Sequence, residues 1–200
     1  MKIGVDCDGV LTDLSAYYQK YGERFFRRKP DEPDGCSISE MFGCSGRVEF
    51  IFGMRYFIPY CKKWPPRVNA AETLRKLADD GHELYQITAR KFVTDTGLLG
   101  RYSRDMHAKW LNENNFHFKD IFYCSEGMAP EHKLKACRKY PIDVMIDDRP
   151  EVAWYLSSRG LRVLLFDTPY NQRAYCPEAI RVKDWDDIYT VITERSWKKA

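Results

Sequence analysis

The most constraining feature of this sequence is a regular alternation of short apolar runs with longer stretches of helical periodicity. Five runs rich in apolar and β-branched residues are typical of buried strands, at residues 2–6, 82–87, 120–124, 142–146 and 162–166. Helices are predicted after them, at about 68–80, 102–114, 130–139, 150–159 and 184–195. Strands and helices alternating in this way form right-handed βαβ units. We therefore expect an α/β fold, a three-layer sandwich around a mainly parallel sheet.

One segment interrupts this alternation. Residues 14–66 show no strand–helix repeat and are dense in aromatic and basic side chains. They predict a helix over about 14–27, a turn at KPDEPDG, and a second helix over about 46–62 that ends before WPP. A chain of 200 residues suits one domain with a modest insertion. We expect a core domain formed by residues 1–13 and 67–200, and a small helical cap inserted at 14–66.

Charge and hydropathy exclude several classes of partner. With 32 basic and 29 acidic side chains the formal charge is only +3, which gives no reason to expect a nucleic-acid polymer. No run approaches the roughly 18 apolar residues of a membrane span, and acidic residues follow the first strand too soon for a signal peptide. Seven cysteines without a C-x-x-C pair indicate reduced thiols. We expect a cytoplasmic protein with no membrane partner; a homodimer is compatible with the sequence, which does not fix the oligomeric state.

Polar side chains follow the carboxyl ends of the expected strands, where open parallel sheets bind their ligands. In chain order they are Asp6, Asp8, Thr88, Arg90, Lys133 in a following helix, Asp147 and Asp148. Carboxylates that converge on one crevice repel each other unless a cation lies among them. Mg²⁺ suits such a place, because it binds carboxylate oxygens and shares its remaining positions with phosphate oxygens. A hydroxyl and an ammonium nearby would complete a site for a phosphoryl group.

Some of these residues have a purely structural alternative. An isolated D-x-D is often a turn with solvated carboxylates, and the pair Asp147-Asp148 could simply begin a helix. Lys135 lies on the same expected helix as Lys133, but Lys133 is favoured because it falls in the first turn, nearest the sheet edge. Arg90 either contacts the phosphate or pairs with a carboxylate, and the sequence does not decide between the two.

Four motifs occur in the order typical of one large enzyme group: DCDGVLTD, YQITAR, a lysine near the start of a helix, and DVMIDDRPE. On these motifs the chain resembles the haloacid dehalogenase superfamily over its whole core. The resemblance implies a Rossmann-like sheet and a phosphatase reaction. Asp6 would be the nucleophile that forms an aspartyl-phosphate, and Asp8 the general acid and base. Thr88 and Lys133 would hold the phosphoryl group.

The same resemblance implies the magnesium ligands. Asp6, the backbone carbonyl of Asp8 and the carboxylate of Asp148 would bind Mg²⁺, with Asp147 as a supporting carboxylate. Elementary chemistry agrees with these roles, because a carboxylate beside a metal ion can attack an oriented phosphorus atom and so divide one hydrolysis into two steps. The leaving alkoxide then needs a proton from a nearby acid.

Within the superfamily, the chain is most similar to the 5'(3')-deoxyribonucleotidase branch and its bacterial nucleotidase relatives. The signals are the cap directly after DGVLTD, a tryptophan helix after ITAR, IDDRPE, and DTPYN after the last expected strand. This implies a magnesium-dependent phosphomonoesterase acting on a small phosphorylated metabolite, with a (deoxy)nucleoside monophosphate as the leading substrate. The alternatives are a phosphatase for sugar phosphates or other metabolites, a mutase with the same core, and a binding domain that retains the fold without turnover.

The cap is expected to choose the substrate, and its aromatic and basic residues are the candidates. Arg55, Phe57 and Lys62 are selected as candidate contacts to a base or sugar, by stacking and by charge. Aromatic and apolar residues at helical spacing more often pack helices together, and on that ground Phe50, Met54 and Phe57 are expected between the cap helices.

Overall fold

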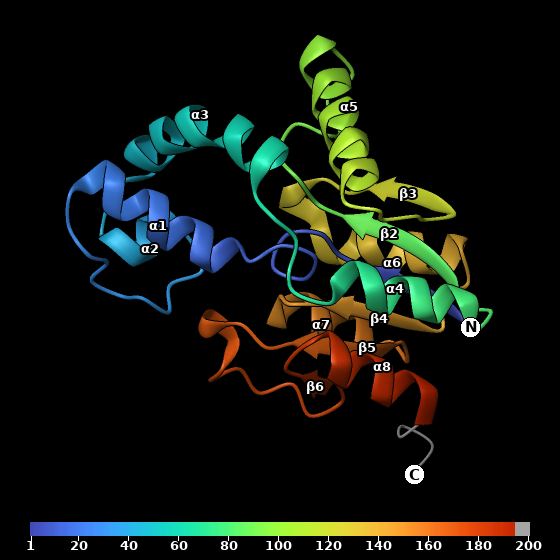
Figure 1. Ribbon diagram of the computed structural model, residues 1–200. Helices are drawn as coiled ribbons and strands as arrows, with labels where there is room; N and C mark the ends of the chain where they lie inside the picture. The colour runs from blue at the N-terminus through green and yellow to red at the C-terminus, as the bar shows by residue number, and fades with distance from the viewer. Residues whose placement is uncertain (195–200) are drawn as a thin grey trace.

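The computed structural model describes residues 1–194 and is built around a six-stranded parallel sheet with the strand order β3-β2-β1-β4-β5-β6 (Figure 1). The strands are β1 (Lys2–Val5), β2 (Glu83–Thr88), β3 (Asp120–Tyr123), β4 (Val144–Asp147), β5 (Arg162–Phe166) and β6 (Ile180–Val182). In the central register Ile3 lies opposite Leu84 on one side and Val144 on the other. The predicted α/β class with a mainly parallel sheet is confirmed.

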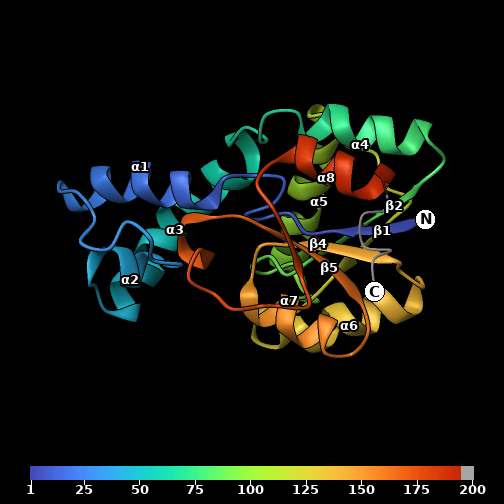
Figure 2. The ribbon, with the colours of Figure 1, turned by 90° about the horizontal axis from the view of Figure 1, so that it is seen from below.

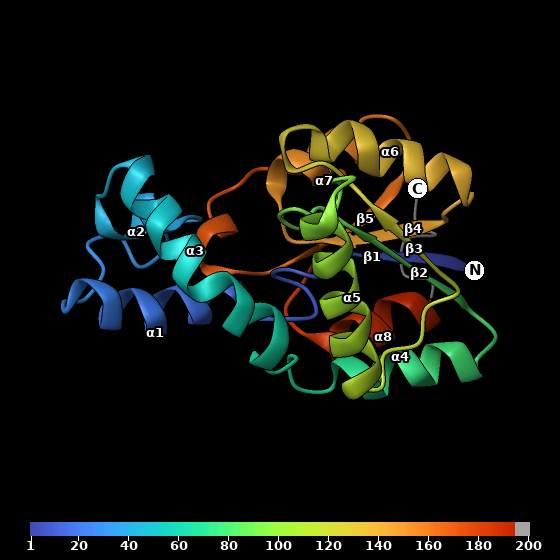
Figure 3. The same cartoon turned by 90° about the horizontal axis from the view of Figure 1, so that it is seen from above.

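Helices cover both faces of the sheet and complete the three layers (Figures 2 and 3). One face carries α4 (Ala70–Asp79), α5 (Leu98–Glu113) and α8 (Trp185–Glu194), and the other carries α6 (Ala129–Lys139) and α7 (Pro150–Ser157). On the first face, Ile3 and Val5 pack in one buried cluster with Leu74, Trp110 and Trp185. Because successive side chains of a strand point to opposite faces, the strands β2, β3, β4 and β5 contribute to both layers of the core.

Three helices project beyond the carboxyl ends of the strands: α1 (Leu14–Phe26), α2 (Ile38–Phe42) and α3 (Gly46–Lys63) (Figures 1 and 2). They have their own apolar cluster, centred on Tyr17, Met41, Phe42, Phe52 and Tyr56. We refer to these three helices as the cap helices. They lie within the insertion predicted at 14–66, and those limits remain our proposed boundaries.

The two ends of this insertion lie side by side. Thr12 and Pro66 form an antiparallel bridge, and the backbone N–H of Arg67 donates to the carbonyl of Leu11 at 2.7 Å. The Arg67 guanidinium also donates to the carbonyl of Gly9 at 3.1 Å and forms an ion pair with Asp13. The chain therefore leaves and re-enters the core at one place.

Two short elements and one helix start differ from the sequence expectation. Strand β6 has only three residues, too few for a periodic signal, and lies at the sheet edge. Helix α2 has five residues and begins after Ser37, whose hydroxyl accepts from the backbone N–H of Glu40; the S-x-x-E capping pattern could have revealed it. Helix α5 begins at Leu98 rather than near 102, because its first turn is largely exposed and shows no apolar period.

The outer face of α3 corrects another expectation. Phe50 and Met54 are 62% and 60% exposed, so they do not pack between the cap helices. Phe57 is half-buried and makes an edge-to-face ring contact with Phe92, in the loop after β2, at 5.4 Å. The apolar residues of α3 therefore occupy two faces, and only one of them faces the other cap helices.

The described part of the chain also bears on thiols and membranes. All seven cysteines are free thiols. Within residues 1–194, no helix combines the length and apolar character that crossing a membrane requires. The 3₁₀ helices η1 (Glu126–Met128) and η2 (Pro169–Asn171) complete the secondary structure and lie beside the cavity described next. The last residue of the helix predicted at 184–195 lies outside the described residues.

Candidate active site

A cavity of about 490 Å³ lies between the carboxyl ends of the strands and the cap helices. Its wall on the core side includes Asp6, Asp8, Thr88, Lys133 and Asp148, brought from four separate parts of the chain. Asp6 and Asp8 follow β1, Thr88 ends β2 and Asp148 follows β4; these three strands are neighbours in the sheet, and Lys133 comes from α6. The parallel topology therefore places the polar residues predicted from the sequence at the carboxyl ends of the strands.

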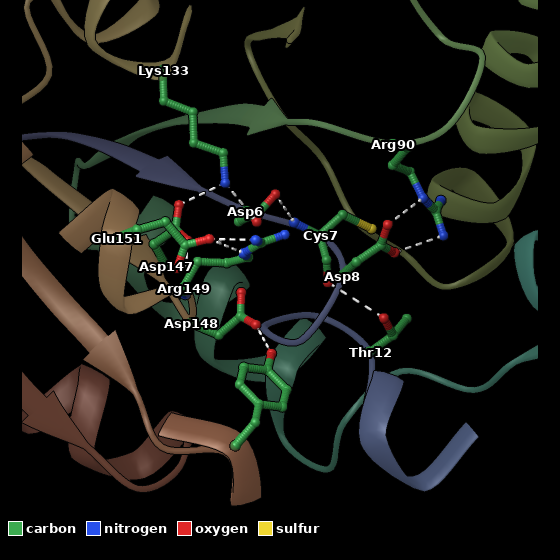
Figure 4. A network of polar contacts seen from close by, with 11 residues as sticks. Asp6, Cys7, Asp8, Thr12, Arg90, Lys133, Asp147, Asp148, Arg149 and Glu151 are labelled. Carbon is green, nitrogen blue, oxygen red and sulfur yellow. Dashed lines mark hydrogen bonds and ion pairs between the residues drawn. The ribbon is translucent and has the colours of Figure 1, made fainter. Parts of the chain in front are cut away.

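Lys133 connects two of the carboxylates (Figure 4). Its ammonium donates to Asp6 Oδ2 at 2.7 Å and to Asp147 Oδ2 at 2.6 Å, and its side chain is only 2% exposed. Burial alone would lower the pKa of Lys133, but the two carboxylates outweigh burial and raise it. Lys133 therefore stays charged. Helix α6 begins at Ala129, so Lys133 lies at the start of its second turn and not in the first turn as predicted. Lys135 is exposed, which removes the alternative.

Asp148 is held beside this pair with one oxygen free. Its Oδ2 accepts a hydrogen bond from the Tyr170 hydroxyl, whereas its buried Oδ1 has no hydrogen-bond partner within residues 1–194. Burial raises the pKa of Asp148 well above its usual value, and the nearby charges of Asp147 and Asp6 add to that effect. A charged carboxylate with a bare oxygen is costly in such surroundings unless a cation binds there.

The donor set fits a hard divalent cation. One carboxylate oxygen from each of Asp6, Asp147 and Asp148 lies within 4.8 Å of the others. Gly9 leaves room beside them, since a Cβ at that position would collide with the Asp148 carboxylate. Its φ of +89° also favours glycine. Asp147 is occupied by Lys133 and by the backbone N–H of Arg149, which suits a supporting position better than a direct ligand.

Asp8 has a different environment, because its carboxylate is bound by side chains from two other elements. The Arg90 guanidinium donates from Nε to Oδ2 at 3.1 Å, and its Nη2 forms an ion pair with Oδ1 at 2.9 Å (Figure 4). Tyr60, on α3, donates its hydroxyl to Oδ1 at 2.7 Å. Arg90 thus pairs with a carboxylate, which is one of the two alternatives that the sequence left open, and it does not line the cavity.

Thr88 ends β2 at the cavity wall. Its side chain is fully buried, and its hydroxyl has no hydrogen-bond partner among the described residues. A buried hydroxyl without a partner is uncommon in proteins and indicates a place for a ligand atom or a water molecule. Thr88 and Lys133 line the same cavity as Asp6.

The cap wall of the cavity is aromatic. Its rings come from α1 and α3: Tyr17, Tyr18, Phe52, Tyr56, Phe57 and Tyr60. Of the cap residues selected from the sequence, only Phe57 belongs to this wall. Arg55 and Lys62 are exposed on other faces of α3, where their cationic groups lie over the rings of Tyr56 and Tyr102. The expected contacts of Arg55 and Lys62 with a substrate do not follow from these positions.

Two contacts near the carboxylates, made by Tyr170 and by Tyr60, were not predicted from the sequence. Tyr170 follows β5 in the DTPYN segment, and the neighbouring Asn171 donates to the backbone carbonyl of Asp148 at 2.8 Å. That segment pointed to the region but not to the contact. Tyr60 lies 52 positions from Asp8, on a helix of the cap, and no local pattern joins the two.

Comparison with known proteins agrees with this arrangement. A family model described as "5' nucleotidase, deoxy (Pyrimidine), cytosolic type C protein" matches residues 1–197. A curated Bacillus cereus protein named "Putative nucleotidase" is 27% identical over 204 residues, which cover 96% of this chain and 98% of that protein.

Solved structures share the fold. A haloacid dehalogenase-like protein of unknown function from Agrobacterium tumefaciens superimposes with a TM-score of 0.70 at 12% identity, over 98% of both chains. The D,D-heptose 1,7-bisphosphate phosphatase from B. bronchiseptica, complexed with magnesium and phosphate, gives a TM-score of 0.58 at 14% identity, over 98% of this chain and 99% of that one. The family match and the shared fold lead to one assignment: the chain belongs to the cytosolic type C 5'-nucleotidase family and is a phosphatase with the haloacid dehalogenase fold.

Proposed function

We propose that the protein is a magnesium-dependent phosphomonoesterase that hydrolyses (deoxy)nucleoside monophosphates through an aspartyl-phosphate on Asp6. The observation that carries this proposal is the position of Asp6. Its carboxylate lies in a cavity and accepts from Lys133 at one oxygen. The same cavity is lined by Asp148 and Thr88, whose Oδ1 and hydroxyl have no hydrogen-bond partner in the described part of the chain. Together these groups can hold a phosphate against a nucleophile.

The metal would be held by Asp6, Asp148 and the backbone carbonyl of Asp8, with Asp147 supporting the set. When bound, Mg²⁺ would neutralise phosphate charge and favour attack by a carboxylate. The bare Oδ1 of Asp148 and the space beside Gly9 support this assignment. Asp147 would act mainly by keeping Lys133 in place, because its Oδ2 accepts from the Lys133 ammonium.

Each residue of the site would then have a separate role in the reaction. Lys133 and the Thr88 hydroxyl would donate to phosphoryl oxygens and orient the phosphorus atom in front of Asp6. One Asp6 oxygen would bond to phosphorus as the bond to the leaving oxygen breaks, and the Asp8 carboxyl would give its proton to that oxygen. Asp8 would next take a proton from the water that attacks the aspartyl-phosphate. The Arg90 ion pair supports a role in holding Asp8, in place of phosphate binding.

The cap wall supports a planar substrate. The rings of Tyr18, Phe52 and Phe57 line a cavity whose other end carries Asp6. A nucleobase can stack on such rings while the 5'-phosphate reaches the carboxylates, whereas a sugar phosphate offers no flat face. The small phosphorylated substrate is the partner that this proposal requires, and the cytoplasmic location expected from the sequence belongs to the same proposal.

Phosphate release tests this function. Nucleoside monophosphates and sugar phosphates would be compared at equal concentration, with Mg²⁺ and with a chelator, and with Asp6→Asn as the inactive control. We expect Mg²⁺-dependent release mainly from nucleotides. Release only from sugar phosphates would retain the chemistry and overturn the substrate, and equal release by Asp6→Asn would overturn the mechanism.

A further inference from the structure

The contact between Tyr60 and Asp8 joins the cap to a residue in the loop that follows β1. The two residues belong to different parts of the molecule, since Tyr60 lies on α3 and Asp8 follows β1. The Tyr60 hydroxyl donates to Asp8 Oδ1 at 2.7 Å and lies 2.6 Å from the hydroxyl of Thr12. Tyr60 is only 6% exposed, so water does not compete freely for this hydroxyl. The hydrogen bond between Tyr60 and Asp8 is therefore a buried structural contact and not a solvent-exposed one.

Two side chains, Arg90 and Tyr60, hold the Asp8 carboxyl. Arg90 contacts both carboxylate oxygens, and Tyr60 contacts Oδ1. The guanidinium carbon of Arg90 also lies 5.3 Å from the centre of the Tyr60 ring, so the two side chains pack as a unit. The Asp8 side chain keeps 25% of its surface exposed and lines the cavity. Such an arrangement restricts rotation of the carboxyl while leaving it accessible to a substrate.

We propose that Tyr60 is a positioning residue that holds the carboxyl of Asp8 for proton transfer to the leaving group, and that it makes this orientation depend on α3 lying over the core. The inference rests on the role proposed above for Asp8. In the step concerned, the bond from phosphorus to the leaving oxygen breaks, and the Asp8 proton moves to that oxygen. The carboxylate left behind accepts from Tyr60 and Arg90, whose donors stabilise it as its charge develops.

The dependence on the cap follows from where Tyr60 lies. It is in the last turn of α3, directly after Pro59 and close to Trp64, whose indole N–H donates to the carbonyl of Asp13 at 2.9 Å. Any displacement of α3 away from the core lengthens the hydrogen bond from Tyr60 to Asp8. Asp8 therefore keeps the hydrogen bond from Tyr60 only when α3 is packed against the core.

The test separates proton transfer from the rest of the reaction. Tyr60→Phe removes only the hydroxyl and keeps the ring beside Arg90. In a single turnover, release of nucleoside from a nucleoside monophosphate should fall about 10- to 100-fold, since positioned acid–base groups contribute on this scale. The first-turnover burst of p-nitrophenolate from p-nitrophenyl phosphate should remain unchanged, because that leaving group departs without a proton.

Tyr21→Phe is the matched control. Tyr21 belongs to the same aromatic cluster, with its ring 4.5 Å from that of Tyr17, but it does not line the cavity. This variant should release both products at the wild-type rate. Equal losses for both substrates in Tyr60→Phe, or no loss for either, would overturn the inference. Failure of the wild-type enzyme to release phosphate from nucleotides would instead overturn the proposed function, so the two failures are distinguishable.

Discussion

The two ends of the cavity are built in opposite ways. At the core end, opposite charges pair at short range: Lys133 lies between Asp6 and Asp147, and Arg90 forms an ion pair with Asp8. At the cap end, rings pack against rings, as Tyr17, Phe52 and Tyr56 do. Charge networks demand particular atoms in particular places, whereas aromatic packing tolerates exchange. The comparison favours our proposal that the core supplies the reacting groups, with Tyr60 as the cap's contribution to the reaction, and that the cap chooses the substrate.

The largest expected effect is at the core end. Asp6→Asn retains the volume of the side chain but removes the nucleophilic charge. Turnover should fall on the order of 10⁴- to 10⁶-fold, as for loss of other enzyme nucleophiles. Steady-state phosphate release measures this, and circular dichroism with thermal unfolding controls for the fold. A rate within tenfold of wild type would show that Asp6 is not the nucleophile.

Lys133→Met should reduce stability strongly. The substitution leaves Asp6 and Asp147 buried side by side without their shared cation, which typically costs about 3–5 kcal/mol in the free energy of unfolding. Urea denaturation measures the change. The matched control is Lys62→Met, an exposed lysine of the cap, for which we expect less than about 0.5 kcal/mol. Similar losses for the two variants would contradict the contrast between the ends of the cavity.

Asp147 and Asp148 are neighbours with different expected roles. Asp148→Asn should raise the Mg²⁺ concentration needed for half-maximal activity by about 10- to 100-fold, because it removes the carboxylate with the free oxygen. Asp147→Asn should act mainly on stability, by about 1–3 kcal/mol, because it removes a partner of Lys133. Metal titration of activity and urea denaturation of each variant distinguish the two. An unchanged titration for Asp148→Asn would remove it from the metal ligands.

The smallest expected effect is at the cap. Phe57→Ala removes a half-buried ring from the cavity wall, and KM for a nucleoside monophosphate should rise about 3- to 10-fold with little change in kcat. Phe50→Ala is the control on the outer face of the same helix, where the ring is 62% exposed, and it should leave both constants unchanged. A fall in kcat with an unchanged KM would mean that Phe57 contributes to the reaction. That result would contradict the proposal that this wall acts on substrate binding.

The difference between the two ends also explains what could be predicted from the sequence. The polar residues at the ends of β1, β2 and β4 were predictable because a parallel sheet brings the carboxyl ends of its strands together. The proximity of Asp6, Thr88 and Asp148 could therefore be predicted without knowing how the side chains pack. The cap wall was not predictable in the same way. Which residues form this wall depends on how α3 is rotated about its own axis. In the structure Phe57 lines the cavity and Arg55 is exposed to solvent.

Contacts between distant segments were hardest to foresee. Tyr60 meets Asp8 only because the end of α3 packs over the loop after β1, and the spacing of 52 residues carries no periodic signal. Arg90 was recognised as a candidate, but its choice of Asp8 over a phosphate depends on the direction of one side chain. Local patterns determine elements, whereas such contacts depend on how the elements pack.

The adjacent ends of the cap insertion have a consequence for how this chain can change. The bridge between Thr12 and Pro66 and the hydrogen bond from Arg67 to Leu11 bring the two junctions together across one backbone pairing. An insertion with joined ends can be lengthened, shortened or exchanged without altering the path of any strand in the sheet. A different insertion could therefore replace this one as a single unit, provided that it supplies side chains for the contacts that Tyr60 and Trp64 make with the core.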